Sequence, residues 1–265
     1  MADNRPIGIF DSGVGGLTVV ARIREMLPDE SVVYFGDTAR VPYGTKSKET
    51  VTRFSVENVE FLMKHNVKFV IVACNTASSL SLAFLKRCFK VPIIGVIGPG
   101  AREAVSVTRN NRIGVIGTHA TVSSGAYEKA IRKIGPEYSV FTAACPLFVP
   151  LVEEGWVDTD VAKIVTQVYL KPLKGRGIDT LILGCTHYPI LKGALKRVMG
   201  KGVVLIDSAR EVAREAGSLM GASGLLNLSK RGGEHRFFVS DEPNRFVRIG
   251  ERFLKRRIKC VRRAG

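Results

Sequence analysis

Short apolar segments alternate with longer segments of helical periodicity along most of this chain. Runs such as "VVYFG" (32–36) and "TLILGC" (180–185) are almost entirely apolar, which is typical of strands buried on both faces of a sheet. The alternation predicts an α/β fold, with mostly parallel sheets flanked by helices. We expect strands at 7–10, 32–36, 69–74, 92–97, 112–117, 138–144, 180–185 and 203–208, and helices at 16–27, 47–65, 76–88, 121–134, 158–174 and 189–198.

The two halves of the chain also resemble each other. "FVIVACNTAS" (69–78) has a clear counterpart in "TLILGCTHYP" (180–189), and "IGIFDSGVGG" (7–16) has a fainter one in "IGVIGTHATVSSG" (113–125). The separations between the paired segments agree to within a loop. The repeat predicts two pseudo-symmetric α/β domains that face each other across a cleft holding the active site. We expect the first domain to comprise residues 1–98 plus 208–265, and the second residues 99–207.

The chain is strongly basic, with a net charge of +16 and a pI of about 9.9. An anionic substrate or a nucleic acid would each explain such a charge. Much of the excess lies in the tail, where nine Arg and Lys residues occur between 245 and 263. Apolar residues recur there at helical spacing: Phe246, Ile249, Phe253, Ile258 and Val261. We interpret the tail as a packed terminal helix with a solvated basic face, and we do not expect nucleic acid as a partner.

Cysteine usage and the N-terminal segment bear on the cellular compartment. The five cysteines are an odd number and form no C-x-x-C pair, which argues against a disulfide framework and a structural zinc site. The start of the chain lacks the pattern of a signal peptide, and no apolar run approaches about 20 residues. We expect a cytoplasmic protein without a membrane span, with Cys88 and Cys145 buried and Cys260 partly exposed.

Polar residues directly follow several predicted strands, where open parallel sheets bind their ligands. They are Asp11, Ser12, Asp37, Cys74, Asn75, Thr76, Thr118, Cys185, Thr186 and His187. The turn preferences of Asp, Asn, Ser and Thr could explain most of these residues. They do not explain two thiols at strand ends, because a structural cysteine more often lies within a strand.

Two glycine-containing turns are candidates for ligand binding. In "FDSGVGGLTVV" the glycines precede a predicted helix, so backbone N–H groups at the helix start can bind an anion. The spacing is not G-x-G-x-x-G, which favours a small carboxylate over a dinucleotide. "RVPYGTKS" (40–47) offers the Pro42, Tyr43 and Gly44 turn, with backbone donors and a phenol hydroxyl.

Cys185 and His187 alone could be a nucleophile and its base. Two thiols from facing domains suggest instead that a thiolate on one side of a carbon removes a proton while a thiol on the other side returns one. Such chemistry inverts a stereocentre without a cofactor and needs acid–base partners for the thiols. Asp11 near Cys74 and His187 near Cys185 are the candidates. Glu153 in "LVEEGW" is a third, although its spacing does not single it out.

At these residues the sequence closely resembles the glutamate racemases of bacterial cell-wall synthesis, in the aspartate/glutamate racemase superfamily. The matching motifs run from residue 7 to about 190: "GIFDSGVGGLTV", "RVPYGTKS", "VACNTAS", "GVIGT", "CPLFVPLVEEG" and "LILGCTHYP". The family often reads Gly-Thr-x-Gly-Thr where this chain has "GTHAT", with Ala120 in place of the second glycine.

The resemblance implies cofactor-independent interconversion of L- and D-glutamate, supplying D-glutamate for peptidoglycan, in a protein that is usually a homodimer. It implies that Cys185 deprotonates the L-enantiomer and Cys74 the D-enantiomer, assisted by Asp11, His187 and Glu153. The positions that match the family's substrate contacts are Asp11, Ser12, Pro42, Tyr43, Gly44, Asn75, Thr76, Thr118, Thr121, Thr186 and His187.

Three alternatives remain open at this point. An aspartate racemase would use the same mechanism on a shorter side chain, and the full set of motifs favours glutamate over it. A nucleic-acid-binding or regulatory protein would show salt-dependent retention on nucleic acid that survives loss of both thiols. A metal site at Cys185 and His187 would have only two ligands, which do not fill a tetrahedral zinc shell.

Overall fold

A computed structural model describes residues 3–264 and shows an α/β protein in which every strand pairing is parallel, as predicted. The chain divides into two compact units. Unit 1 comprises the chain up to Val96 and from Ala209 onwards, and unit 2 comprises Ile97–Ser208. No helix among residues 3–264 combines the length and apolarity that a membrane span requires.

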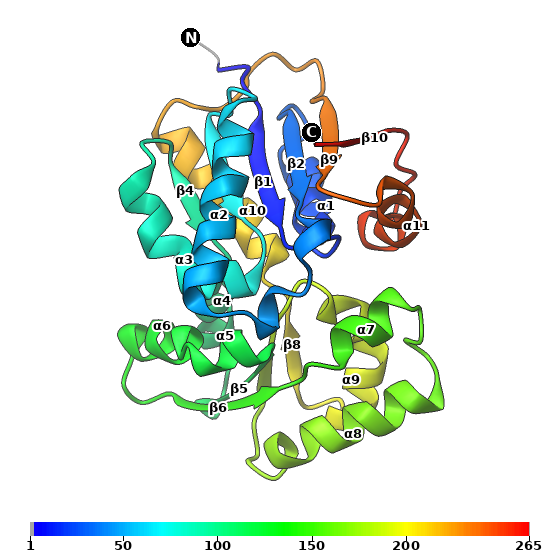
Figure 1. The fold of residues 1–265 in the computed structure, drawn as a ribbon. Coiled ribbons are helices and arrows are strands. Elements are labelled where there is room, and N and C mark those ends of the chain that lie inside the picture. Colours follow the sequence, from blue (N-terminus) through cyan, green and yellow to red (C-terminus); the bar gives the residue numbers. More distant parts are fainter. Residues whose placement is uncertain (1–2, 265) are drawn as a thin grey trace. The chain divides into compact units, whose positions relative to one another are not determined.

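Unit 1 contains a six-stranded sheet in the order β10-β9-β2-β1-β3-β4 (Figure 1). Its strands are β1 (Ile7–Asp11), β2 (Val32–Gly36), β3 (Phe69–Val72), β4 (Ile93–Gly95), β9 (His235–Val239) and β10 (Val261–Arg263). Its helices are α1 (Leu17–Met26), α2 (Lys48–Met63), α3 (Asn75–Cys88), α10 (Ala209–Ala222) and α11 (Pro243–Leu254). Two 3-10 turns, η1 (Thr38–Arg40) and η2 (Tyr43–Thr45), follow β2.

Helices cover both faces of this sheet, which explains why its central strands are apolar throughout. On one face Phe10, Val33 and Val70 join a core with residues of α2 and α3. On the other face Tyr34 packs against Phe246 of α11, with ring centroids 5.8 Å apart. All five residues of β1 and of β2 are buried, so the continuous apolar pattern reports burial on both sides.

Unit 2 contains a four-stranded sheet in the order β6-β5-β7-β8. The strands are β5 (Arg112–Gly117), β6 (Ser139–Ala144), β7 (Thr180–Gly184) and β8 (Val204–Ile206). The helices are α4 (Ile97–Val107), α5 (His119–Ser123), α6 (Ala126–Ile134), α7 (Phe148–Glu153), α8 (Asp160–Lys174) and α9 (Lys192–Met199), and the 3-10 turn η3 spans Tyr188–Leu191.

The two sheets share one topology. The order β2-β1-β3-β4 within unit 1 corresponds strand for strand to β6-β5-β7-β8 in unit 2. The segment before Cys74 is β3 and the segment before Cys185 is β7, and these strands occupy corresponding places in their sheets. The repeat in the sequence is therefore a repeat of topology.

Several sequence-based predictions differ from the structure. The tail is not one helix: α11 ends at Leu254, Lys255 is left-handed (φ 55°), and Val261 lies in β10, which pairs with β9. The predicted helix 121–134 is divided into α5 and α6 at Gly125, whose φ is 62°. The predicted strand 92–97 ends at Gly95, and Ile97 begins α4, which the sequence analysis missed. Cys88 is exposed, because it lies on the outer side of the last turn of α3, whereas Cys145 is buried and Cys260 exposed as expected.

Candidate active site

Cys74 lies at the carboxyl end of β3 as the N-cap residue of α3. It is buried, with 5% of its surface exposed. The partial positive charge at a helix N-terminus favours negative charge on a sulfur at this position. Asn75 and Thr76, the first two residues of α3, are also buried. The strand-to-helix junction thus presents one thiol together with backbone N–H groups of the first helical turn.

The turn after β1 brings Asp11 and Ser12 close to Cys74. β1 pairs directly with β3, so their carboxyl ends are adjacent. The Cys74 Sγ donates to Ser12 Oγ over 3.6 Å. The Asp11 carboxylate, fully buried, accepts from the Gly13 backbone N–H over 2.9 Å. The structure therefore gathers the predicted residues Asp11, Ser12 and Cys74 at one edge of the sheet.

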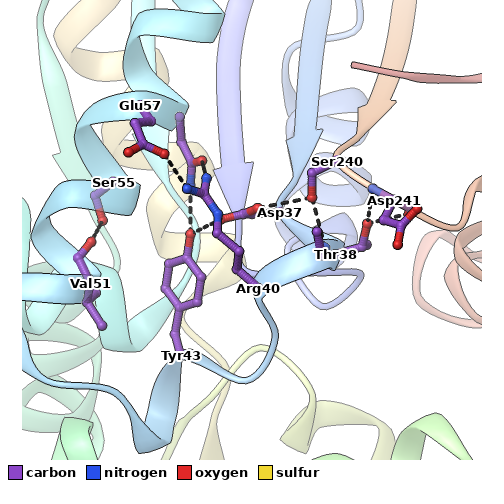
Figure 2. Close-up of polar contacts among 11 residues, drawn as sticks. Asp37, Thr38, Arg40, Tyr43, Val51, Ser55, Glu57, Ser240 and Asp241 are labelled. Carbon is purple, nitrogen blue, oxygen red and sulfur yellow. Dashed lines mark hydrogen bonds and ion pairs between the residues drawn. The ribbon is translucent and has the colours of Figure 1, made fainter. Parts of the chain in front are cut away.

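The Pro42–Gly44 turn is built around the buried side chain of Tyr43. Its hydroxyl donates to the Asp37 carboxylate (Figure 2). The same hydroxyl accepts from Asn58 Nδ2 over 3.0 Å. Burial and the negative charge of Asp37 raise the pKa of Tyr43 well above its ordinary value. The Tyr43 hydroxyl already has these two partners within unit 1. The turn is therefore better suited to bind a ligand through its backbone N–H groups than through the phenol hydroxyl that the sequence suggested.

Cys185 lies at the carboxyl end of β7 with His187 beside it. Both residues are buried, and Cys185 Sγ lies 4.0 Å from His187 Nδ1. The other ring nitrogen, Nε2, lies 3.2 Å from Oε1 of Glu153, the last residue of α7. The three side chains form a chain of contacts from thiol to imidazole to carboxylate. The structure thus joins Glu153, which sequence spacing could not place, to the other two.

The charge state of His187 follows from these contacts. Burial by itself would lower the pKa of His187. The hydrogen bonds to Cys185 and Glu153, together with the negative charges of both groups, outweigh burial and raise the pKa to about 10. The imidazole is therefore protonated at neutral pH and places a positive charge beside the Cys185 sulfur.

Threonines occupy the turns next to Cys185. Thr118 follows β5 and caps α5, accepting from the Thr121 backbone N–H over 3.2 Å. The hydroxyls of Thr118 and Thr121 lie 3.0 Å apart. Thr186 is buried directly after Cys185. Because β5 pairs with β7, these hydroxyls and the Cys185 thiol belong to adjacent strand ends of one sheet.

Two buried tyrosines support the thiol-bearing turns and were not singled out from the sequence. Tyr34 donates to the Gly13 carbonyl over 2.7 Å and so fixes the turn that carries Asp11 and Ser12. Tyr188 donates to the Cys145 carbonyl over 2.8 Å and so fixes the segment that follows His187. Each residue reads as an apolar core position in the sequence, because only the tertiary structure reveals the partner of its hydroxyl.

Comparison with known proteins gives consistent results across sequence and structure. The family model described as Asp/Glu/Hydantoin racemase matches residues 7–216. The glutamate racemase of Geobacter metallireducens is 54% identical over 250 residues, covering 94% of this chain and 93% of that protein.

Solved structures of glutamate racemases have the same fold. The RacE1 isoform from Bacillus anthracis superposes with a TM-score of 0.95 at 42% identity, over 99% of this chain and 98% of that chain. The enzyme from Francisella tularensis, solved in complex with D-glutamate, has a TM-score of 0.93 at 40% identity, with the same two coverages.

Proposed function

This chain belongs to the Asp/Glu/hydantoin racemase family and, within it, groups with the glutamate racemases, so we propose that it interconverts L- and D-glutamate. The observation that carries this proposal is the matched placement of Cys74 and Cys185. Cys74 follows β3 and Cys185 follows β7, and these two strands occupy the same position in sheets of the same topology. Each thiol has an ionisable neighbour, which is Asp11 for Cys74 and His187 for Cys185.

The proposed reaction is a two-base proton exchange at the α-carbon. For L-glutamate, the Cys185 thiolate removes the α-proton and becomes a thiol, and the electron pair of the broken C–H bond is delocalised into the α-carboxylate. The Cys74 thiol then gives its proton to the opposite face of the carbon and becomes a thiolate. The D-enantiomer reacts in the reverse sense, so atoms and charges balance without a cofactor.

The neighbours of the two thiols fit different resting states. Protonated His187, held by Glu153, places a positive charge beside Cys185, which must be a thiolate to accept a proton from L-glutamate. On the other side, Asp11 at the neighbouring strand end is suited to take the proton of the Cys74 thiol when D-glutamate is the substrate.

Substrate binding is proposed to use the polar groups at the same strand ends. Removing a proton next to a carboxylate places a second negative charge beside the first, so fixed N–H and O–H donors must share it. Such donors are available from most of the residues that were predicted as substrate contacts, namely Ser12, Tyr43, Gly44, Asn75, Thr76, Thr118, Thr121 and Thr186, whereas Pro42 has no N–H and shapes the turn. Of these, the Pro42–Gly44 turn contributes through its backbone N–H groups after the proline.

The direct test is circular dichroism of L-glutamate incubated with the purified protein, without pyridoxal phosphate or added metal. The signal should decay to zero with the wild type and persist with Cys74→Ala and with Cys185→Ala. Cys88→Ala is the matched control, because Cys88 is an exposed thiol at the far end of the helix that Cys74 begins. Decay with aspartate but not glutamate would replace the substrate and keep the mechanism.

We further propose a cytoplasmic homodimer that supplies D-glutamate for peptidoglycan. Its domains would be the predicted ones, residues 1–98 with 208–265 and residues 99–207. Light scattering coupled to size exclusion tests the dimer, and a D-glutamate requirement after deletion of the gene tests the cell-wall role.

A further inference from the structure

Asp37 is a buried carboxylate that the proposed chemistry does not use. It follows β2 directly, and none of its surface is exposed. Its backbone N–H donates to the Asp11 carbonyl over 3.0 Å, which ties the end of β2 to the end of β1. A buried carboxylate is costly unless it is paired and hydrogen-bonded, so its partners indicate what it stabilises.

Three side chains donate to the Asp37 carboxylate (Figure 2). Arg40 Nε donates to Oδ2 over 2.7 Å and neutralises the charge. The Tyr43 hydroxyl also donates to Oδ2. Ser240 Oγ donates to Oδ1 over 3.0 Å. The carboxylate therefore joins the turn after β2, the Pro42–Gly44 turn and a residue more than 200 positions away in the sequence.

The contact with Tyr43 fixes the turn that we propose to contact the substrate. The Tyr43 side chain is 1% exposed, its ring lies 5.6 Å from that of Phe54, and its hydroxyl is held by both Asp37 and Asn58. A tyrosine anchored at the ring and at the hydroxyl leaves its own backbone little freedom. The N–H groups of Tyr43 and Gly44 are thereby held in one place.

The contact with Ser240 connects the same carboxylate to the C-terminal segment. Ser240 Oγ also accepts from the Ala39 backbone N–H over 2.9 Å. The next residue, Asp241, donates its backbone N–H to Thr38 Oγ1 over 2.9 Å, and the Thr38 hydroxyl donates back to the Asp241 carbonyl. The loop between β9 and α11 is thus fastened to η1 beside Asp37.

We propose that Asp37 is a positioning residue for the racemase reaction, which holds the Pro42–Gly44 turn through Tyr43 and is itself held by Ser240. The proposal rests on the proposed function, because it assigns the turn to substrate binding. Asp37 does not touch the reacting atoms. Its loss should weaken binding of both enantiomers and leave the thiols in place.

The expected kinetic signature separates positioning from a purely structural role. Asp37→Asn removes the negative charge that Arg40 pairs with and leaves one carbonyl oxygen for the three donors that two carboxylate oxygens now serve, so the hold on Tyr43 is weakened. KM should rise about tenfold or more for both enantiomers while kcat stays within about threefold. Because the enantiomers have equal free energies, kcat/KM must fall equally in both directions, which checks the data internally.

Two further variants follow the same contacts and serve if Asp37→Asn folds poorly. Tyr43→Phe removes only the hydroxyl and should reproduce the rise in KM. The double variant should be little worse than the more severe single variant, since both substitutions act on the hydrogen bond between Asp37 and Tyr43. Ser240→Ala should raise KM by about threefold, as one of three donors is lost.

Asp179→Asn is the matched control. Asp179 also accepts several hydrogen bonds, from Thr108 Oγ1 over 2.7 Å and from the backbone N–H groups of Arg109 and Asn110. It precedes β7, at the strand end opposite to Cys185. Its substitution should lower the melting temperature and leave KM unchanged.

Amide hydrogen exchange of residues 41–46 provides a readout that does not depend on catalysis. Exchange should accelerate in Asp37→Asn and in Tyr43→Phe, and remain at the wild-type rate in Asp179→Asn. Folded Asp37→Asn and Tyr43→Phe proteins with wild-type KM and wild-type exchange would overturn the proposal. A wild type without glutamate racemase activity would defeat the proposed function, while the exchange rates would still decide whether Asp37 holds the turn.

Discussion

The imidazole of His187 lies 3.2 Å from the carboxylate of Glu153 and turns its other nitrogen toward Cys185. The contacts of the ring with Cys185 and with Glu153 together raise the pKa of His187, so the buried histidine is protonated in a place where burial alone would keep it neutral. It also gives Glu153 a role that depends on charge, because its carboxylate helps to keep His187 protonated.

The raised pKa of His187 predicts a specific pH dependence of stability. The pKa is about 10 in the folded protein against an ordinary value of 6.5. The folded state therefore binds this proton more tightly, and the stabilisation is fully present below about pH 6.5 and is lost as pH rises through about 10. Urea denaturation at pH 6, 8 and 10 should show a falling free energy of unfolding.

Glu153→Gln tests the cause of that dependence. Removing the carboxylate charge should lower the pKa of His187, as followed by NMR of its ring, and should make the loss of stability with pH shallower. Glu60→Gln, at an exposed acid on α2, is the control and should leave both unchanged. An unchanged His187 titration in Glu153→Gln would refute the assignment.

Asp11→Asn should separate the chemical role of Asp11 from its structural role. The amide oxygen can still accept from the Gly13 N–H, so the turn and the melting temperature should be kept. The charge that we propose to receive the Cys74 proton is lost, so kcat should fall about 100-fold. Chiral chromatography of both enantiomers measures the rates. Wild-type rates would show that Asp11 only shapes the turn.

A single methyl group at Gly16 should disturb the same turn from the other side. An added Cβ would lie 2.6 Å from the Asp11 Cβ and 3.0 Å from both the Ala73 Cβ and the Tyr34 hydroxyl. The backbone itself suits alanine, since φ is −62°, so the effect is steric. We expect Gly16→Ala to lower stability by about 1–3 kcal/mol and to reduce activity.

Gly202→Ala is the control for this prediction. Apart from the two adjacent residues, no heavy atom of residues 3–264 lies within 4 Å of a Cβ added at Gly202. Thermal melts and racemase assays of the two variants should differ clearly. Equal melting temperatures and equal activities would mean that the Asp11 turn adjusts without cost.

The sequence predicted the central strands well, because burial on both faces leaves a continuous apolar run. The segments 32–36 and 112–117 have the bounds that the structure shows. The start of α4 was missed because Gly98, Pro99 and Gly100 are typical of turns. The first turn of a helix tolerates proline, and these residues lie in that turn.

The tail and the polar networks show where sequence periodicity is insufficient. Ile258 and Val261 continue the spacing of Phe246 and Phe253, yet the left-handed Lys255 ends the helix before them. The thiols were found because strand ends are visible in the sequence. The contacts of Asp37 with Ser240 and of Glu153 with His187 join distant segments, and local pattern carries no signal for such pairs.

The most direct test of the two-thiol mechanism is racemisation of L-glutamate in D₂O, with deuterium at the α-carbon measured separately in each enantiomer at low conversion. Two bases on opposite faces predict that the D-glutamate formed carries solvent deuterium while the remaining L-glutamate stays protiated. Deuterium entering both enantiomers equally from the first turnovers would indicate a single base serving both faces and would contradict the assignment of Cys74 and Cys185.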